Sequence, residues 1–468
     1  MVRKRTEVAD IERGVFDKKN KFEWSKISEK GLTEEIVRGI SQEKKEPQWM
    51  LDIRLEGLKR FYEQENPTWG PDISEVVIDD IITYIKPKSD MKGDWSELPE
   101  NIKQTFYDLG IPQAEIESLS GVGAQYDSEV VYHNIKDYLL EQGVIYTDMD
   151  SAVQKYPDIV KEYFMKAIPA TDHKYAALHY AVWSGGSFVY VPKGVTVDIP
   201  LQSYFRLNAP GAGQFEHTLI IIEEGSYCHF IEGCSAPKYN VVNIHAGAVE
   251  LFVKKDATLR YSTIENWSRN MYNLNTKRAI VRENAKIEWI SGSFGSKVSM
   301  LYPSSYLLGE GAKSEFTGIS FAGEGQNLDT GAKIIHAAPN TSSTTMSKSI
   351  SKSGGIATYR GMVWFTEDAT GSKASVDCES LMLDNISVSD TIPSIKIDNN
   401  DVDLGHEAKI GRIDDDKIFY LMSRGISEKE AKAMLVRGFA EPIAKELPLE
   451  YAVEMNNLIN LELEGSIG

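Results

Sequence analysis

The amino-acid sequence predicts a mainly β protein, with a right-handed parallel β-helix (solenoid) core flanked by helical regions at its N- and C-terminal ends. From about residue 184, strand-like alternation of apolar and polar residues replaces the helical period. Within this stretch a turn residue followed by a short alternating run recurs at intervals of 31, 31, 28, 27, 29, 31 and 29 residues. The repeats begin at Gly194, Gly225, Asp256, Asn284, Gly311, Asn340, Gly371 and Asn400.

The length and content of this repeat favour a β-helix over other repetitive folds. Gly, Asn and Asp accept the left-handed backbone that a tight corner demands. A βαβ unit of this length would need a helix in every repeat. A propeller blade needs ~40 residues or more, and a left-handed coil of three hexapeptides needs ~18. Strands of successive coils are therefore expected to pair in parallel, ~4.8 Å apart.

Residues 1–180 predict a mostly helical N-terminal region, followed by the β-helix core over residues 181–405. The segment PQWMLDIRLEGLKRFYEQE has apolar residues at helical spacing, although Gly57 interrupts it. The segment DSEVVYHNIKDYLLEQG ends on Gly143, which is typical of a helix C-cap. Ser151 and Gln154 form a capping-box pattern that predicts the start of another helix.

Residues 406–468 predict a C-terminal helical domain. Ser427 and Glu430 form a capping box at the start of a helical pattern, and a second amphipathic stretch follows it. A helical end-piece is a natural cap for a solenoid, because it covers the open edge of the last coil.

Composition narrows the classes of partner. The 468 residues are 42% hydrophobic, enough to bury a substantial core, and carry a net charge of −18. Nucleic acid and anionic membranes reward clustered Lys and Arg, so neither is expected as a partner. The charged N-terminus lacks the apolar segment of a secretory signal, and no apolar run approaches the ~18 residues of a membrane span. Three cysteines make a sparse, odd set that suits the reducing cytoplasm.

The repeat register predicts a pair of ligands near the C-terminal end of the core. Cys378 lies seven residues after its turn residue, and Glu407 lies seven residues after the next one. We therefore expect Cys378 and Glu407 side by side in adjacent coils, with His406 next to them. Thiolate, imidazole and carboxylate together can bind iron or zinc, and Cys378 with Glu407 is the predicted metal pair.

The same reasoning predicts a second pair five coils away. Cys234 and Glu265 each lie nine residues after their turn residues. Offsets of seven and nine share one parity, so Cys234 and Cys378 are expected on the same side of their strands. Five coils separate them by roughly 24 Å, too far for a disulfide or a shared metal. The alternative is that these cysteines, like Cys228, are small buried core residues.

No standard catalytic motif is present. The sequence has no Walker A loop, no G-x-G-x-x-G fingerprint, no H-E-x-x-H, no C-x-x-C and no nucleophile elbow. A carboxylate beside a thiol raises the pKa of that thiol, which favours cation binding over nucleophilic catalysis. We therefore expect a scaffold or binding protein with no catalytic residues rather than an enzyme.

Three segments carry a resemblance to a known family: QFEHTLIIIEEGSYCHFIEGCSAP, VDCESLMLDN and DLGHEAKIGRI. They closely resemble the SufB/SufD family of the SUF iron–sulfur cluster assembly system, and within it the SufB scaffold subunits. The similarity runs from about residue 20 to the C-terminus. It implies a β-helix core between helical regions, and a protein that receives sulfur and iron, builds a nascent iron–sulfur cluster and passes it on.

The resemblance also implies roles for individual residues. Cys378 matches the cysteine that holds the nascent cluster, with His406 and Glu407 nearby, and Cys234 matches the cysteine that receives sulfur. A further set matches residues that line a passage for sulfur inside the helix: Arg206, Asn208, Glu265, Trp267 and Lys277. Glu265 replaces a glutamine of the family, so a neutral lining becomes acidic.

The partners implied by the resemblance are a SufC-like ABC-type ATPase, SufD or a second copy of this chain, and a cysteine desulfurase with its sulfur carrier. Because this sequence has no Walker A loop, the resemblance implies that the ATPase site is on a partner. Some relatives are reported with a reduced flavin, which no motif here identifies. Two other readings stay open from the residues alone: a β-helix carbohydrate-active enzyme and a purely structural solenoid.

Overall fold

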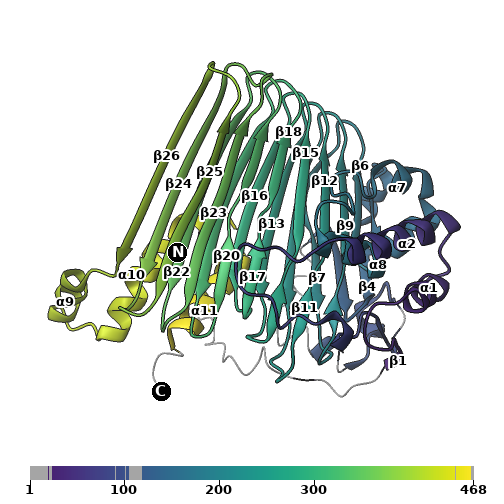
Figure 1. Ribbon diagram of the computed structural model, residues 1–468, viewed down its shortest axis with the longest axis horizontal. Helices are drawn as coiled ribbons and strands as arrows, with labels where there is room; N and C mark the ends of the chain where they lie inside the picture. Colours follow the sequence, from purple (N-terminus) through teal and green to yellow (C-terminus); the bar gives the residue numbers. More distant parts are fainter. Residues whose placement is uncertain are drawn as a thin grey trace, which may run out of the picture.

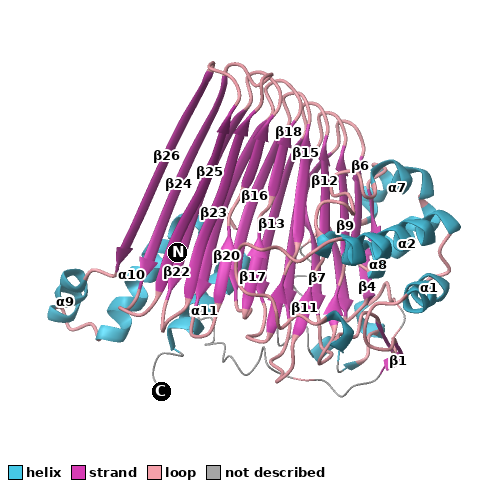
Figure 2. Cartoon of the chain, in the orientation of Figure 1, coloured by secondary structure: helices cyan, strands magenta, loops and turns pink. Residues whose placement is uncertain are grey.

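The chain folds around a parallel β-solenoid of about eight turns, with helical regions at both ends (Figure 1). The computed structural model describes residues 19, 24–89, 91–100, 102–104, 119–447 and 449–464. Residues 1–18, on which the expectation about a secretory signal rests, lie outside this part. The mainly β fold class predicted from the repeat is confirmed (Figure 2).

One long wall of the solenoid is a ten-stranded sheet in which each coil contributes one strand. Its order is β26-β24-β22-β19-β16-β13-β10-β7-β3-β4, parallel except for the antiparallel β3–β4 pair. The strands are β3 (Gly121–Tyr126), β4 (Glu129–Ile135), β7 (Thr196–Arg206), β10 (Tyr227–Ser235), β13 (Thr258–Asn266), β16 (Lys286–Phe294), β19 (Lys313–Ala322), β22 (Ser342–Ser351), β24 (Ser372–Met382) and β26 (Val402–Arg412).

The facing wall is a fourteen-stranded sheet made of the remaining strands of the coils. Its upper half is β5 (Ile145–Asp148), β6 (Ser187–Val191), β9 (His217–Ile222), β12 (Ala248–Val253), β15 (Thr276–Val281), β18 (Ser304–Leu307) and β21 (Lys333–His336). Its other half is β8 (Gly213–Gln214), β11 (Asn243–His245), β14 (Met271–Asn273), β17 (Val298–Leu301) and β20 (Asn327–Thr330). The long β23 (Ile356–Phe365) joins the halves, and β25 (Val388–Ile397) pairs with β23.

The predicted turn residues form one corner of the solenoid. Seven of the eight adopt a positive φ, and Asn400 is the exception. Their backbone N–H groups donate from one coil to the next, for example from Gly225 to the carbonyl of Lys255 at 2.9 Å and from Asn340 to that of Thr370 at 2.8 Å. Gly, Asn and Asp adopt a left-handed backbone at the lowest conformational cost, which explains why these residue types mark each repeat in the sequence.

Helices of the N-terminal region cover the outer face of the fourteen-stranded sheet. They are α1 (Glu34–Glu43), α2 (Gln48–Glu63), α6 (Met149–Lys155), α7 (Pro157–Tyr163) and α8 (Lys174–Val182). The short α5 (Asp137–Glu141) instead packs its Leu139 in the interior cluster, with Val189 and Ile220. The helix predicted around Gly57 is confirmed as α2. A Cβ on Gly57 would lie 2.8 Å from the backbone nitrogen of Ala181, so this glycine allows α2 and α8 to cross closely.

Two helices predicted in this region differ from the structure. The first half of the segment ending at Gly143 forms strand β4, because Val130, Val131 and Tyr132 suit a strand that pairs with β3, and only α5 is helical. The cap of α6 is Asp148, whose carboxylate accepts from the backbone N–H of Ser151, rather than Ser151 itself.

Three helices follow the solenoid: α9 (Asp415–Ser423), α10 (Glu428–Ala444) and α11 (Leu449–Glu464). Ser427 caps α10, accepting from the backbone N–H of Glu430 as predicted. Apolar residues of α10 and α11 pack on the outer face of the ten-stranded sheet, against Ile264, Ile290 and Ile319. The last strand, β26, crosses the domain boundary expected at residue 405.

These packing contacts assign the two faces of the ten-stranded sheet. On β13, Ile264 faces α10 and α11, so its neighbours Thr263 and Glu265 point into the solenoid. The register of the parallel strands then extends this assignment from coil to coil. Cys234 and Cys378 lie on the same side of the sheet, as predicted, and the structure shows that this side is the interior, where each is at most 2% exposed.

Candidate functional site

Cys234 and Glu265 form the pair that the sequence predicted. They are directly opposite in the register of β10 and β13, and both side chains are buried inside the solenoid. The pKa of the Cys234 thiol is raised well above its usual value. Burial is the main cause, and the carboxylates of Glu232, Glu216 and Glu265 add to it, while Lys277 opposes them. Cys234 is therefore a neutral thiol in an acidic interior.

A buried charged triad lies beside this thiol. The ammonium of Lys277, on β15, is 3.2 Å from Glu232 and 3.4 Å from Glu265, and all three side chains are fully buried. Lys277 also donates to the hydroxyl of Thr263 at 3.2 Å, and Asn273 donates to Glu265 at 2.6 Å. Burial alone would lower the pKa of Lys277, but the two carboxylates raise it above its usual range. One cation thus bridges the two sheets between two anions.

The other predicted passage residues divide between two places. Trp267 packs in one apolar cluster with Cys234, and its ring centroid lies 4.6 Å from that of His245. Arg206 pairs with Ser235, the residue after Cys234, and donates to its hydroxyl at 3.0 Å. Since neighbouring residues of a strand face opposite ways, Arg206 lies on the other side of the sheet from the thiol. Asn208 follows β7, where its backbone N–H donates to Asp127 at 2.7 Å.

Cys378 lies inside the solenoid at its C-terminal end. It packs with Tyr359, Val376 and Ala374, and the Tyr359 hydroxyl donates a hydrogen bond to its sulfur. Burial raises the pKa of Cys378 to about 12, while the Tyr359 hydrogen bond opposes this shift and Asp377 adds to it. This environment is largely apolar and carries far less charge than that of Cys234.

The predicted pairing of Cys378 with Glu407 is wrong by one residue. In the register of β24 and β26, Cys378 is opposite Ala408, and Glu407 is opposite Asp377. A one-residue slip moves a side chain to the other face of the sheet, so Glu407 points outward. Its carboxylate is 64% exposed and lies 3.1 Å from the ammonium of Lys409.

His406 shares the inward face with Cys378, because it is opposite Val376 in the same register. Its Nε2 atom is buried and has no hydrogen-bond partner among the described residues. A neutral imidazole with a free nitrogen is a ready ligand for a metal ion. Within one chain, His406 therefore lies on the same face of the sheet as Cys378, and Glu407 lies on the opposite face.

Two columns of inward side chains connect the two cysteines across five coils. The first runs from Glu232 through Thr263, Ser291, Gly318 and Ser347 to Cys378. The second runs from Cys234 through Glu265, Ser293, Ser320 and Ser349 to Ser380. Ser349 and Ser380 share a hydrogen bond of 2.8 Å. Between the acidic triad and Cys378, both columns consist of small side chains, nearly all with hydroxyl groups.

The comparisons with known proteins agree with this architecture. The family model "SUF system FeS cluster assembly, SufBD core domain" matches residues 205–439, and the model "SufBD protein N-terminal region" matches residues 43–203. An iron–sulfur cluster assembly SufBD family protein of Staphylococcus aureus (strain MRSA252) is 56% identical over 441 residues, covering 94% of this chain and 95% of its own length. This chain belongs to the SufBD family. A SufBD family protein of Staphylococcus haemolyticus (strain JCSC1435) is 54% identical over 468 residues and the full length of both chains.

The sequence alone did not predict several residues that surround the two cysteines in this SufBD protein. Glu232 is two positions before Cys234, so the alternation of the strand alone could have placed it on the same face. Tyr359 reaches Cys378 from the facing sheet, and no spacing in the sequence predicts such a contact. Glu216 and His245 form a buried ion pair near Trp267, and they too come from separate strands and loops.

The described residues offer few metal ligands close to one another. Within the described ranges, no three His, Cys, Asp or Glu side chains gather closely enough to hold a metal ion. Cys378 and His406 therefore supply at most part of a ligand set. Among the helices described, none is both long and apolar enough to cross a membrane.

Proposed function

We propose that this SufBD protein is a scaffold that accepts sulfur at Cys234 and holds a nascent iron–sulfur cluster at Cys378. The observation that carries the proposal is the pair of inward columns that join these two thiols through small hydroxyl side chains. The cluster is cargo that is built and passed on. The chain is a scaffold rather than an enzyme, and ATP hydrolysis belongs to a partner.

Sulfur acceptance begins with a persulfide on a cysteine desulfurase or its carrier. The Cys234 thiolate attacks the outer sulfur, a new S–S bond forms on Cys234, and the carrier leaves as a thiolate. This step needs Cys234 to lose a proton and to become accessible. Since the thiol is 1% exposed and its pKa is raised, docking of the carrier must open this end of the solenoid.

The route from Cys234 passes the buried triad. Release of the outer sulfur as hydrosulfide requires a two-electron donor such as a dithiol, which breaks the S–S bond of the Cys234 persulfide, becomes a disulfide and returns Cys234 to a thiol. Lys277 is the cation that can attract this hydrosulfide, whereas Glu232 and Glu265 repel it. Trp267 forms an apolar wall beside Cys234, and Arg206 and Asn208 support the adjoining strand end from the other face. Beyond the triad the two serine-rich columns carry no charge, so they offer a path with hydroxyl donors and no fixed anion.

At the end of this path we propose Cys378 and His406 as the ligands from one chain. Thiolate is a soft ligand for iron and sulfide, and imidazole suits iron as well. Glu407 is a ligand only after a rearrangement of β26, because its carboxylate now points away from the sulfur. The remaining ligands would come from a second chain, either SufD or another copy of this one.

The C-terminal end of the solenoid supports such a partner. The strands β25 and β26 are largely exposed, and Ile395, Ile397 and Ile410 are each 47–49% exposed. An uncovered edge with apolar side chains is a template for pairing with another β-helix.

The helix α9 supports a second partner, a SufC-like ABC-type ATPase. Phe419 is 72% and Tyr420 57% exposed on this short helix. Large exposed aromatic residues often anchor protein interfaces. ATP-driven closure of the ATPase would then move α9 to α11 and, through them, the outer face of the ten-stranded sheet.

We also propose that the protein works in the cytoplasm. Three free cysteines suit the cytoplasm. The sequence has no motif for a flavin, and no step described above depends on one.

Anaerobic reconstitution tests this function. The native protein, Cys378→Ala, His406→Ala and Cys234→Ala would be supplied with ferrous iron and either free sulfide or a desulfurase with cysteine, and cluster formation followed by visible absorption and Mössbauer spectra. We expect Cys378→Ala to lose the cluster from both sulfur sources and His406→Ala to hold it less tightly. Cys234→Ala should keep the cluster formed from free sulfide and lose the one formed with the desulfurase. If Cys378→Ala and Cys234→Ala form the cluster as the native protein does, the proposal is wrong and both cysteines are core residues only.

A further inference from the structure

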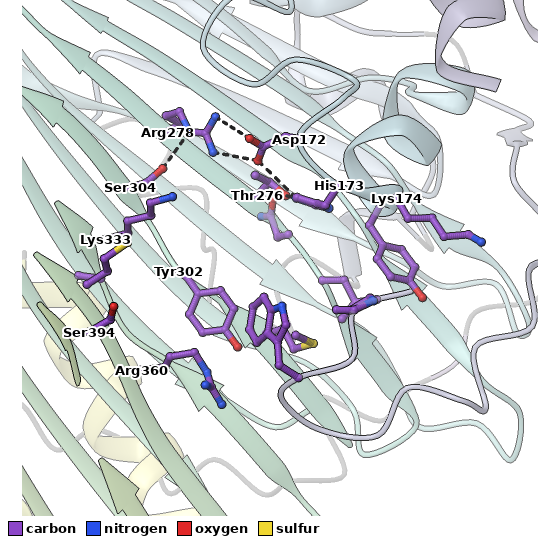
Figure 3. A pocket seen from close by; sticks show the side chains of 18 of the residues that line it. Asp172, His173, Lys174, Thr276, Arg278, Tyr302, Ser304, Lys333, Arg360 and Ser394 are labelled. Atoms are coloured by element: carbon purple, nitrogen blue, oxygen red, sulfur yellow. Dashed lines mark hydrogen bonds and ion pairs between the residues drawn. The ribbon is translucent and has the colours of Figure 1, made fainter. Parts of the chain in front are cut away.

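A cavity of about 720 Å³ lies on the outer face of the fourteen-stranded sheet (Figure 3), and no cysteine lines it. One wall is formed by chain segments around Trp69 and Asp172 from the N-terminal region. The other is formed by successive coils, whose strands β15, β18, β21 and β23 contribute outward side chains. Small-molecule sites typically enclose roughly 300–1,000 Å³ between domains or layers. The size and place of this cavity therefore suit a ligand of moderate size.

The coils place basic side chains in the cavity at regular positions. Arg278, Ser304 and Lys333 are in register on β15, β18 and β21, so they form one column, and Arg360 follows diagonally on β23. At ~4.8 Å per coil, Arg278 and Lys333 are roughly 10 Å apart along the solenoid. Figure 3 shows these side chains on one wall of the cavity.

The charges in the cavity do not balance. Arg278 is bound by Asp172 through two hydrogen bonds of 3.1 and 2.9 Å, and Arg360 is bound by Asp329 at 2.6 Å. Lys333 has no carboxylate partner among the described residues. Burial, together with the charge of Arg278, lowers the pKa of Lys333, and the carboxylate of Asp172, which is bound to Arg278, opposes this shift only in part. An anion in the cavity would supply a counter-charge.

A buried amide in the same cavity also lacks partners. Asn275 is 3% exposed, and neither its Nδ2 nor its Oδ1 has a hydrogen bond among the described residues. Buried amides are almost always hydrogen-bonded, so an unpaired one in a cavity wall is a polar group whose hydrogen bonds a bound ligand could supply. Asn275 can both donate and accept, as recognition of a polar heterocycle or a ribose requires.

The far side of the cavity is aromatic. The rings of Trp69 and Tyr302 lie 5.6 Å apart, and the guanidinium of Arg360 lies 5.2 Å over the ring of Trp69. Trp69 is 49% exposed although it lines a cavity. An exposed tryptophan at the mouth of a basic cavity is a platform on which a flat ring can stack.

We propose that this cavity binds a mononucleotide, with its phosphate at Lys333 and its base against Trp69 and Tyr302. A phosphate accepts charge-assisted hydrogen bonds from the ammonium of Lys333 and from the N–H groups of Arg360 that do not face Asp329. The Asn275 amide then lies free to bind the sugar or the base. This site shares no residue with the sulfur route, so it stands independently of the proposed scaffold function.

Isothermal titration calorimetry of the full chain with AMP, GMP, CMP and UMP, and with the matching nucleosides, tests the site. We expect at least one mononucleotide to bind, and its nucleoside to bind more weakly. Lys333→Gln should weaken the mononucleotide by about tenfold or more and leave the nucleoside unchanged, because it removes only the phosphate contact. Lys333→Arg should retain binding within a few-fold. Trp69→Ala should weaken both ligands.

The matched control is Lys313→Gln, which removes an exposed lysine from the ten-stranded sheet. Thermal melting of each variant separates loss of binding from loss of fold. The proposal is overturned if none of the four mononucleotides binds the native chain, or if folded Lys333→Gln and Lys313→Gln bind equally tightly.

Discussion

Glu265 lies directly beside Cys234 in the next coil of the solenoid, and both side chains point into its interior. The carboxylate is one of three that, with burial, hold the pKa of the thiol far above its usual range. The same carboxylate is also one of two anions bound by Lys277. The reactivity of the Cys234 thiol and the stability of the core are thus coupled through one side chain.

Replacing Glu265 by glutamine should make Cys234 more reactive. The change removes a negative charge beside the thiol, so its pKa falls and more thiolate is present at a given pH. Alkylation by a small reagent, followed at the Cys234 peptide by mass spectrometry between pH 7 and 10, should be several-fold faster in Glu265→Gln. Glu283→Gln, on the exposed surface, should leave the rate unchanged. An equal rate in both variants would contradict the assigned environment.

Removal of Lys277 should destabilise the protein strongly. Lys277→Met leaves Glu232 and Glu265 buried without their cation, which costs about 3–5 kcal/mol. Two unpaired carboxylates take up protons more readily in the folded state, so the loss should shrink as the pH falls. Urea unfolding at pH 7.5 and pH 5.5 measures it. The double variant Glu232→Gln/Lys277→Met should recover part of the stability, and no recovery would argue against the triad.

Tyr359→Phe should make Cys378 less reactive. The lost hydrogen bond from the Tyr359 hydroxyl is the one interaction that lowers the pKa of this thiol, so the pKa rises further. The pH at which alkylation of Cys378 becomes rapid should move upward, and Tyr306→Phe, on the outer face of β18, serves as the control. A shift to lower pH would show that Tyr359 does not donate to the sulfur.

A larger side chain in the serine columns should block the sulfur route. Ser349→Leu fills the interior one coil before Cys378 and removes the hydrogen bond to Ser380. We expect cluster formation from a desulfurase to fall to less than about a tenth of the native rate, a barrier increase of ~1.4 kcal/mol. Cluster formation from free sulfide should remain.

Thr344→Leu is the control for that experiment, because Thr344 lies on the same strand and is exposed on its outer face. Overpacking costs ~1–3 kcal/mol, so the melting temperature of both variants must be compared first. Equal loss from both sulfur sources would indicate damage at Cys378 rather than a blocked route.

His336 should lower the free energy of unfolding at mildly acid pH. It is fully buried, bound to Thr341 and Ser343, and burial lowers its pKa to about 4. Between pH 6.5 and 4 the unfolded chain binds a proton that the folded chain does not, so this residue costs stability as the pH falls. At pH 5 the cost is about 2 kcal/mol. The stability advantage of the native protein over His336→Gln should therefore be smaller at pH 5 than at pH 7; a constant difference would contradict a depressed pKa.

The register at the two cysteines shows where sequence reasoning succeeds and where it stops. The corner that begins each repeat is marked by a single Gly, Asn or Asp with positive φ from Gly194 to Gly371, so Cys234 and Glu265 could be aligned by counting. The last corner, DNND at residues 398–401, offers several such residues. The pairing of Ser372 with Val402 places the repeat one residue later than Asn400 predicts. Because strand side chains alternate, that single residue moved Glu407 to the outer face.

The sequence by itself determined the β-helix, its flanking helices, the shared parity of the two cysteines and the family. Each of these rests on local signals: turn residues that need a left-handed backbone, alternation along a strand, capping residues, and long matching segments. The tertiary structure alone decided that Lys277 bridges Glu232 and Glu265, that Tyr359 donates to Cys378, and that Lys333 and Trp69 line one cavity. These contacts join different strands, and in the first two cases facing walls, of a solenoid. Distance along the chain carries no information about which side chains meet across its interior.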